Sequence, residues 1–232
     1  MFSYIWDMSQ FSIIITAGGI GKRMGGTLPK QFMHVQGKPI LLHTLEILHK
    51  YDSSAQLIIT LPNEWVSYWK EVLEERNCTI PHELVDGGSE RYHSIKNALS
   101  VCKGDFIAVH DGVRPLVNHQ TIKNCFNAVR EKGQVIPVVS VKESLRMLCD
   151  ETSKAVPRAN YCLVQTPQVF KAEVLKIAYE REFHAAITDD ASLVEEAGFP
   201  ITLVEGNEEN IKITTQLDLK IAEITVLKNG NF

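Results

Sequence analysis

Residues 13–26 read IIITAGGIGKRMGG, in which an apolar strand runs directly into a glycine-rich bend. Five glycines lie in this bend, and three cations, Lys22, Arg23 and Lys30, lie in it or shortly after it. Glycines let backbone N–H groups approach an oligophosphate closely, and the cations offset its negative charge. The stretch therefore predicts a nucleotide-binding site after the first strand.

Two familiar phosphate-binding loops do not fit this spacing. A Walker loop needs glycine, four residues and then Gly-Lys-Ser/Thr, but Thr16 stands five residues before Gly21, and Arg23 follows Lys22. The dinucleotide fingerprint needs two residues between its last glycines, whereas three residues separate Gly21 from Gly25. An ordinary strand-to-helix turn remains the alternative, and it would not need three cations.

Length and composition indicate one domain with a small-molecule partner. The chain has 232 residues, of which 44% are hydrophobic, and this is enough for one substantial core over 1–232. The net charge is −4, with 24 basic and 28 acidic residues well mixed, so no basic face is predicted for nucleic acid.

The first residues and the cysteines predict where the protein works. The beginning of the chain is too short and too mixed for a signal peptide, and no later stretch has the apolar length of a membrane span. We expect 1–11 to be a flexible leader, with Met8 as the alternative start. The five cysteines have no zinc spacing, so reduced, mostly buried thiols are expected. A cytoplasmic protein that does not bind membranes is predicted.

Short apolar runs alternate with amphipathic stretches along the chain. This pattern is typical of the α/β class, with a Rossmann-like, mainly parallel sheet flanked by helices on both faces. Strands are expected near 12–16, 56–60, 82–85, 106–110, 134–140, 163–170 and 201–204. Helices are expected at 39–50, 63–76, 89–102, 118–131, 171–182, 189–197 and 215–228, with Ser89 and Asn118 as helix caps.

The segment 141–160 interrupts this alternation. It is polar and charged and has no helical stripe, so we predict a protruding two-stranded arm. The alternative is a long surface loop, although loops of more than about a dozen residues within compact domains are usually functional or disordered. An arm of this kind can reach a second subunit.

A second glycine turn occurs at 86–94, after the third expected strand. Ligands of doubly wound sheets bind beyond the carboxyl ends of the strands, so the backbone of this turn can frame a base or a ribose. Ser94 can offer a hydroxyl to a base edge, and the alternative is an exposed serine that contacts only water.

A carboxylate and a guanidinium lie three residues apart in the bend at 110–115. Asp111 can hold a ribose hydroxyl or a water of magnesium, and Arg114 can donate two hydrogen bonds to a phosphate. A mutual salt bridge that fixes the bend is the alternative. We assign a structural role to His110, because it ends an apolar strand.

Two later places can also contribute to a site. Thr188 opens a helix, where it or a following aspartate serves as a cap or where the helix amides bind a phosphate. Lys212 lies in an expected short strand, where its side chain points to solvent or, if the strand borders the crevice, into it.

Seven motifs in order resemble those of the 2-C-methyl-D-erythritol 4-phosphate cytidylyltransferase family. They are AGGIGKRM (17–24), PKQ (29–31), DGGSER (86–91), HDGVRP (110–115), TPQ (166–168), TDDAS (188–192) and NIK (210–212). The resemblance covers about 12–228. It implies a fold of the nucleotide-diphospho-sugar transferase type and a homodimeric enzyme that joins CTP to methylerythritol 4-phosphate. It also implies a magnesium ion held mainly by the CTP phosphates, with Asp111 as the candidate protein ligand.

The resemblance implies a role for each matching position. For the cytosine it implies Ala17, Gly18, Gly88 and Ser94; for the ribose, Ser89 and Gly112; for the rest of the CTP-binding bend, Gly19, Gly21 and Lys22. For charge stabilisation in catalysis it implies Arg23, Lys30 and Lys212. For the acceptor it implies Asp111, Arg114, Thr166 and Thr188, together with Ser144 and Arg158 from the arm of the partner subunit, so that 141–160 is also the dimerisation segment.

Some positions depart from the commonest family pattern and leave the acceptor open. Ser89 replaces an aspartate, Gly112 and Val113 replace two alanines, and Ser144 replaces a threonine. A sister family, the ribitol 5-phosphate cytidylyltransferases, shares nearly all of the motifs and is the main alternative. A nucleotide-sugar pyrophosphorylase and a non-catalytic nucleotide-binding regulator are the more distant ones.

Overall fold

The sheet is built outward from β1 (Phe11–Thr16). Three consecutive isoleucines have the branched side chains that suit a pleated strand, and every residue from Phe11 to Ile15 is buried. A strand buried on both faces belongs inside a parallel sheet. β1 accordingly pairs in parallel with β4 (Gln56–Leu61) on one side and with β6 (Phe106–Asp111) on the other.

The computed structural model describes residues 10–19 and 28–229, and the main sheet has eight strands in these ranges. Their order is β10-β7-β11-β6-β1-β4-β5, and β12 pairs with β7. The remaining strands of this sheet are β5 (Glu83–Asp86), β7 (Gln134–Ser140), β10 (Cys162–Val164), β11 (Gln168–Lys171) and β12 (Ile201–Glu205). Only β10 and β11 pair antiparallel to their neighbours, so the prediction of a mainly parallel α/β sheet is confirmed.

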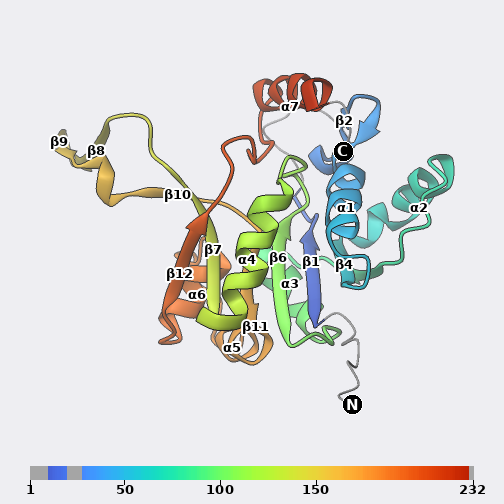
Figure 1. Cartoon of the computed structure of the whole chain (residues 1–232), viewed down its shortest axis with the longest axis horizontal. Coiled ribbons are helices and arrows are strands. Elements are labelled where there is room, and N and C mark those ends of the chain that lie inside the picture. Colours follow the sequence, from blue (N-terminus) through green and yellow to red (C-terminus); the bar gives the residue numbers. More distant parts are fainter. Residues whose placement is uncertain (1–9, 20–27, 230–232) are drawn as a thin grey trace, which may run out of the picture.

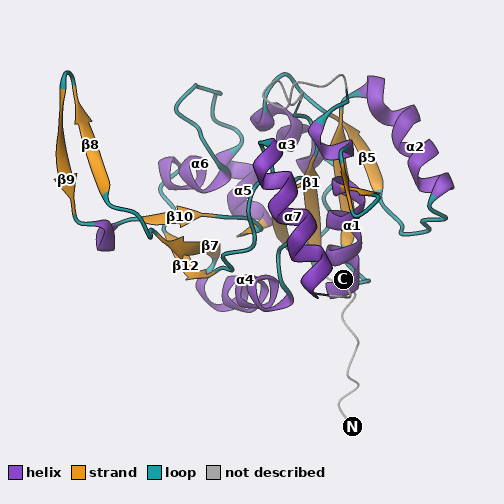
Figure 2. Cartoon of the chain, turned by 90° about the horizontal axis from the view of Figure 1, so that it is seen from above, coloured by secondary structure: helices purple, strands orange, loops and turns teal. Residues whose placement is uncertain are grey.

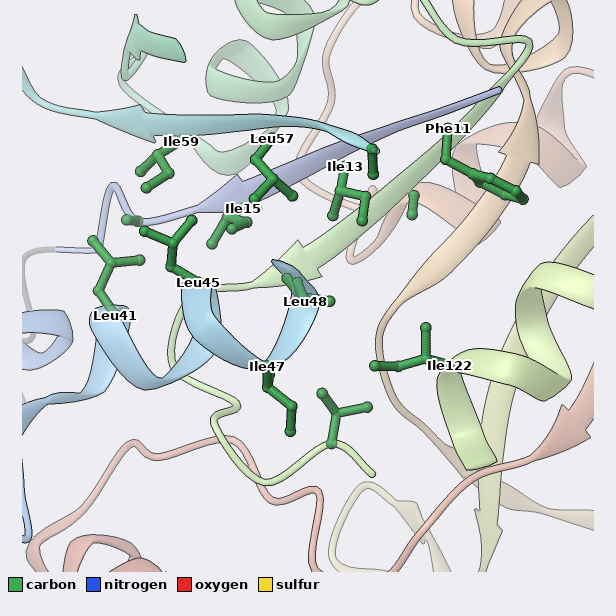
Figure 3. Packing of buried hydrophobic residues seen from close by; sticks show 14 of the residues in the cluster. Phe11, Ile13, Ile15, Leu41, Leu45, Ile47, Leu48, Leu57, Ile59 and Ile122 are labelled. Carbon is green, nitrogen blue, oxygen red and sulfur yellow. The ribbon is translucent and has the colours of Figure 1, made fainter. Parts of the chain in front are cut away.

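Alternation along the strands divides the core into two layers. Ile13 and Ile15 of β1 face α1 (Ile40–Tyr51), α2 (Val66–Glu75) and α4 (His119–Lys132), as Figure 3 shows for Leu41, Leu45 and Ile122. Ile14 faces the opposite layer, formed by α3 (Arg91–Leu99), α5 (Ala172–Ala178) and α6 (Asp190–Glu196). The sheet is therefore covered by helices on both faces (Figure 1).

A smaller cluster closes the end of the sheet toward which β1 runs. α7 (Gln216–Asn229) lies there above β1 and α1 (Figure 1), near the short strands β2 (His34–Val35) and β3 (Lys38–Pro39). Ala222 of α7 packs in one cluster with Val113 and Ile213. Three single-turn 3-10 helices complete the secondary structure of the described residues: η2 (Lys30–Phe32), η3 (Asn63–Trp65) and η4 (Arg158–Asn160).

Two predicted element boundaries are wrong. The expected strand 163–170 is two strands, β10 and β11, because Pro167 has no N–H to donate to a ladder and Gln165 turns its amide into the interior. The helix expected from 89 begins at Arg91, and its first flanking residue is Glu90 rather than Ser89. Asn118, in contrast, caps α4 as predicted, because its side chain accepts a hydrogen bond from the Thr121 amide at 2.7 Å.

The arm predicted at 141–160 is present. β8 (Leu145–Cys149) and β9 (Thr152–Val156) pair antiparallel as a separate two-stranded sheet. Figure 2 shows this hairpin far from the helices that cover the main sheet. The alternative of an irregular surface loop is therefore wrong, and the arm presents its side chains to the outside.

The predicted leader lies almost entirely outside the described residues, and the prediction for the thiols fails in part. Of the leader predicted at 1–11, only Gln10 and Phe11 fall within the described residues, and Phe11 already belongs to β1. All five cysteines are free thiols, but Cys162 on β10 is exposed, so the expectation of mostly buried thiols fails there. Across the described ranges, every helix is too short or too polar to cross a bilayer.

Candidate active site

The carboxyl ends of β1, β4, β5 and β6 lie at one edge of the sheet, because these four strands are parallel neighbours. Residues that follow β1, β5 and β6 line a cavity of about 340 Å³, which we name the glycine pocket. Nine residues with predicted site roles line it: Ala17, Gly18, Gly19, Lys30, Gly88, Ser89, Ser94, Asp111 and Lys212. Segments far apart in the sequence thus meet at the edge where ligands of such sheets bind.

The wall at Gly88 depends on close packing of its turn against α3. A side chain at Gly88 would place its Cβ 2.2 Å from Cβ of His93, which no real structure tolerates. Ser94 then secures the turn, because its Oγ accepts a hydrogen bond from the Gly88 amide at 2.9 Å and donates one to the Glu90 carbonyl at 3.2 Å. Ser94 is only 2% exposed, so the alternative of a solvent-exposed serine is wrong.

Gly18 and Gly19 add backbone without side chains to the lining of the glycine pocket. A Cβ on Gly18 would lie 3.4 Å from Oγ of Ser94, which is ordinary contact, so space exists there that a ligand can use. A Cβ on Gly19 would lie 3.0 Å from Cε of Lys30. The side chain of Lys30 therefore lies directly against Gly19, and this places a cation where the bend is open.

A second cavity, of about 240 Å³, adjoins the first, and we name it the Thr166 pocket. It shares Arg91, Asp111 and Lys212 with the glycine pocket. Its other lining residues are Arg114, Val164, Gln165, Thr166, Gln168, Thr188 and Asp189. The structure therefore brings four predicted acceptor residues together, in a cavity that has a wall in common with the predicted nucleotide site.

Asp111 is the centre of charge at this shared wall. Its Oδ2 lies 2.9 Å from Nε of Arg114 and 3.2 Å from Nζ of Lys212, and its Oδ1 lies 3.7 Å from Nε of Arg91. Burial raises the pKa of this carboxyl, but Lys212, Arg91 and Arg114 together hold it well below its usual value. Asp111 is thus a permanent anion among three cations, and the salt bridge to Arg114 that we considered as an alternative does form.

His110 organises the same bend through hydrogen bonds at both ring nitrogens. Its Nε2 lies 3.1 Å from the carbonyl oxygen of Arg114, so Nε2 carries the hydrogen and Nδ1 accepts one from the Thr166 hydroxyl at 3.0 Å. The Thr166 oxygen in turn accepts from the Asp111 amide at 3.1 Å. Burial lowers the pKa of His110 to about 4, so the ring is neutral at pH 7. The structural role predicted for His110 is confirmed.

A network of buried amides, which the sequence did not reveal, places Lys212. Gln165 donates to the carbonyl of Asn207 at 2.8 Å, and Asn210 donates to the carbonyl of Thr166 at 2.8 Å. The Ile213 amide then bonds to the Val113 carbonyl at 3.0 Å. The segment is irregular rather than the expected strand, and these bonds direct Lys212 into the crevice. Two asparagines in GNEEN (206–210) were the available signal.

A known family matches this chain along most of its length. The family model described as IspD, 2-C-methyl-D-erythritol 4-phosphate cytidylyltransferase, matches residues 11–228. The chain belongs to this family. It is therefore a nucleotidyltransferase, and membership of the family explains why its seven motifs occur in the family's order.

Relatives within the 2-C-methyl-D-erythritol 4-phosphate cytidylyltransferase family match over nearly their whole lengths. The enzyme of Bacteroides thetaiotaomicron is 52% identical over 211 residues, which cover 90% of this chain and 96% of that protein. The enzyme of Phocaeicola vulgatus is 49% identical over 215 residues, covering 92% of this chain and 98% of that protein.

Solved structures from the same family share the fold. The 4-diphosphocytidyl-2C-methyl-D-erythritol synthase of Anaerococcus prevotii superposes with a TM-score of 0.82 at 28% identity, covering 95% of this chain and 97% of that chain. The cytidylyltransferase of Thermus thermophilus superposes with a TM-score of 0.77 at 29% identity, covering 93% of this chain and 98% of the other.

Some residues that the family resemblance singled out lie elsewhere. Gly112 lines neither pocket, and its amide donates to the Thr16 carbonyl at 2.9 Å, so the backbone donor expected beside the ribose is already engaged. Ser144 and Arg158 lie at the arm, and Arg158 donates to the Lys142 carbonyl and lines a separate hollow. Gly21, Lys22 and Arg23 fall outside the described residues.

Proposed function

We propose that the protein transfers the cytidylyl group of CTP to 2-C-methyl-D-erythritol 4-phosphate, giving CDP-methylerythritol and pyrophosphate in non-mevalonate isoprenoid precursor synthesis. The observation that carries the proposal is the wall that the two pockets share, with Asp111, Arg91 and Lys212 at their junction. Two anionic substrates bound on either side of this wall meet beside fixed positive charge. The relatives described above carry the name of the methylerythritol phosphate enzyme, and no observation favours ribitol 5-phosphate.

The reaction needs no general base. The second pKa of a phosphate monoester is about 6, so the acceptor is already mostly a dianion at neutral pH and can attack the α-phosphate of CTP. His110, which precedes Asp111 on β6, has both ring nitrogens engaged in hydrogen bonds and is neutral at pH 7. Catalysis then consists of holding two anions in line and stabilising the charge that develops on the phosphates.

The cations of the two pockets suit this demand. Lys30 and Lys212 place point charges in the glycine pocket, and Arg114 supplies a guanidinium fork to the acceptor phosphate in the Thr166 pocket. Arg23, with Gly21 and Lys22, is assigned to the triphosphate from its place in the glycine bend. Thr188 completes the acceptor side.

The base and the ribose are assigned to the part of the glycine pocket that lies against the Gly88 turn. Ala17, Gly18 and Gly88 offer backbone there, and Ser94 keeps one lone pair beyond the two hydrogen bonds it makes. Ser89 lies beside them and presents a hydroxyl for the ribose. Gly19 keeps the bend open in front of Lys30.

Magnesium is proposed as the cofactor, held mainly by the CTP phosphates. In the described part of the chain, no three acidic, histidine or cysteine side chains gather in a metal-binding group. Two carboxylates, Asp111 and Glu90, do line the glycine pocket, and magnesium is commonly held by one or two carboxylates together with substrate phosphates and water. The residues therefore fit such an ion, with Asp111 as its protein partner, and the ion would neutralise charge on the nucleotide. Chelation should abolish pyrophosphate release, and added magnesium should restore it.

A homodimer through the arm is also proposed, in the cytoplasm. Leu148 of β8 is 85% exposed and Leu163 of β10 is 56% exposed, which leaves apolar surface along the arm and its base. A second copy of the chain would bury this surface and would bring Ser144 and Arg158 to the acceptor site of its partner. The single chain leaves both residues outside the two pockets.

One experiment tests the function and its rivals. Purified protein receives CTP and magnesium, with methylerythritol 4-phosphate and ribitol 5-phosphate in separate reactions, and released pyrophosphate is measured. Faster release with methylerythritol 4-phosphate is expected. Faster release with ribitol 5-phosphate would support the sister family, and activity only with sugar 1-phosphates would support a pyrophosphorylase. CTP binding without turnover on any acceptor would indicate a regulator.

A further inference from the structure

Arg91 lies between the two pockets, and the mechanism proposed above gives its side chain no specific role. It is the first residue of α3, directly after the Gly88 turn, and it lines both the glycine pocket and the Thr166 pocket. Its side chain is 27% exposed, so most of it is enclosed by neighbouring groups. What holds the guanidinium therefore affects both substrate sites.

The guanidinium of Arg91 bridges two carboxylates. Its Nη2 lies 2.5 Å from Oδ2 of Asp190, and its Nε lies 3.7 Å from Oδ1 of Asp111. The first contact is a close ion pair, and the second is longer. Arg91 is therefore anchored to Asp190, and it reaches one oxygen of Asp111 while Arg114 and Lys212 contact the other.

Asp190 holds Arg91 in place and does not itself face either pocket. It is fully buried, and it belongs to the lining of neither pocket. Its Oδ1 accepts a hydrogen bond from the Tyr179 hydroxyl at 2.6 Å, and its amide donates to Oε1 of Gln168 at 3.1 Å. A buried carboxylate needs a compensating cation, and Arg91 is the cation in contact with it among the described residues.

The charges at the junction depend on this anchoring. Burial lowers the pKa of the Arg91 guanidinium, but Asp190 and Asp111 outweigh burial and raise it above its usual value, so the charge is permanent. While Asp190 neutralises Arg91, the single charge of Asp111 is shared mainly by Arg114 and Lys212, which together keep a net positive charge for a phosphate. Without Asp190, Arg91 would attract Asp111 more strongly and withdraw it from those two cations.

We propose that Arg91 is a positioning residue for the acceptor phosphate: anchored by Asp190, it fixes the Asp111 carboxylate at the wall between the two pockets, and Asp190 acts only through it. The inference rests on the proposed function, since it concerns the acceptor side of that reaction. It predicts that a fully buried residue outside both pockets controls acceptor binding.

The test compares three variants in the steady-state pyrophosphate assay with CTP, magnesium and methylerythritol 4-phosphate. Asp190→Asn keeps the shape and removes the charge, and Arg91→Lys keeps a charge that cannot span both carboxylates. Each should raise the KM for the acceptor about tenfold and the KM for CTP less than about threefold, because Arg114, the partner from which Asp111 would be withdrawn, lines the Thr166 pocket and not the glycine pocket. The acceptor KM of the double variant should be no higher than that of the more strongly affected single variant, because the two residues act as one unit.

A matched control separates positioning from general stability. Tyr179→Phe removes the hydrogen bond to the other oxygen of Asp190 and leaves the ion pair with Arg91 in place. Its acceptor KM should stay within about twofold of the wild type, even where its melting temperature falls. Melting temperatures of all variants are measured alongside.

Three outcomes would overturn the assignment. Single variants whose acceptor KM is unchanged, effects that multiply in the double variant, or a Tyr179→Phe control that raises the acceptor KM as much as Asp190→Asn would each contradict it. A wild-type protein that releases no pyrophosphate would instead overturn the proposed function, and this role with it. An active wild type with unaffected variants overturns the role of Arg91 alone.

Discussion

Nζ of Lys212 lies 3.2 Å from Oδ2 of Asp111, so a cation from the loop before α7 meets the carboxylate that ends β6. Lys212 is 40% exposed, which leaves part of its ammonium group open to a ligand. We expect Lys212→Met to lower kcat by about 10² to 10³, as the loss of one preorganised charge commonly does. Lys103→Met, which removes an exposed lysine paired with Glu83, is the control and should leave kcat unchanged. Equal kcat values for the two variants would contradict the role of Lys212.

Lys30 and Arg23 are expected to act in the same way from the glycine bend. Lys30→Ala or Arg23→Ala should lower kcat by about 10² to 10³, because each removes a cation from the developing charge on the phosphates. Pyrophosphate release at saturating CTP measures the effect. Near-normal turnover in both variants would rule out the assignment.

Gly18 and Gly88 should respond differently to the same substitution. Gly88→Ala forces its Cβ to within 2.2 Å of Cβ of His93, so we expect lower stability together with weaker CTP binding. Gly18→Ala meets only Oγ of Ser94 at 3.4 Å, so the fold should tolerate it while the methyl group occupies space for the nucleotide. Melting temperature and calorimetric CTP affinity distinguish the two cases. Intact CTP binding in Gly18→Ala would place the base elsewhere.

His110 should make stability depend on pH. Its pKa is about 4 in the folded chain against 6.5 for an unperturbed ring, so between these values the unfolded chain binds a proton that the folded chain does not. The free energy of unfolding should therefore fall by about 3 kcal/mol as pH falls from 6.5 to 4, and this loss should end below pH 4. His110→Gln should lose this contribution in denaturant titrations. A variant with the same pH dependence as the wild type would refute the assignment.

The proposed exchange of arms predicts complementation between two inactive chains. In the proposed dimer, Arg158→Ala removes a residue that a chain contributes to the site of its partner. Lys30→Ala removes a residue from the chain's own site. Mixed dimers should therefore contain one site with both residues intact. Activity should return when the two variants exchange subunits. If activity never returns although exchange is demonstrated, each site is complete within its own chain.

Local pattern was enough to predict most of the fold. Three consecutive isoleucines, Ile13 to Ile15, predict a strand that is buried on both faces. The alternation of strands and helices along the chain then predicts a mainly parallel sheet. The split of 163–170 escaped prediction because it depends on where Gln165 finds its partners. These are carbonyl groups in the segment at 207–210, and their position is set by tertiary packing alone.

The sequence predicted those site residues that directly follow a strand. It did not predict contacts between residues that are far apart in the sequence. Glycines and cations at the ends of strands identified most of the lining, because parallel strands deliver their following turns to one edge. The ion pair of Arg91 with Asp190 joins positions 99 residues apart, and no local spacing reports it. The hydrogen bond from the Gly112 amide to the Thr16 carbonyl likewise could not be read from the sequence.

The wall common to the two pockets also matters for inhibitor design. A compound with two anionic groups that binds Arg91 and Lys212 would extend into both cavities at once. Either substrate would then displace it, so its potency would fall as the concentration of CTP or of the acceptor rises. Resistance by substitution of residues in this wall would be hard to acquire, because a substitution that weakens binding of the inhibitor would also weaken binding of a substrate.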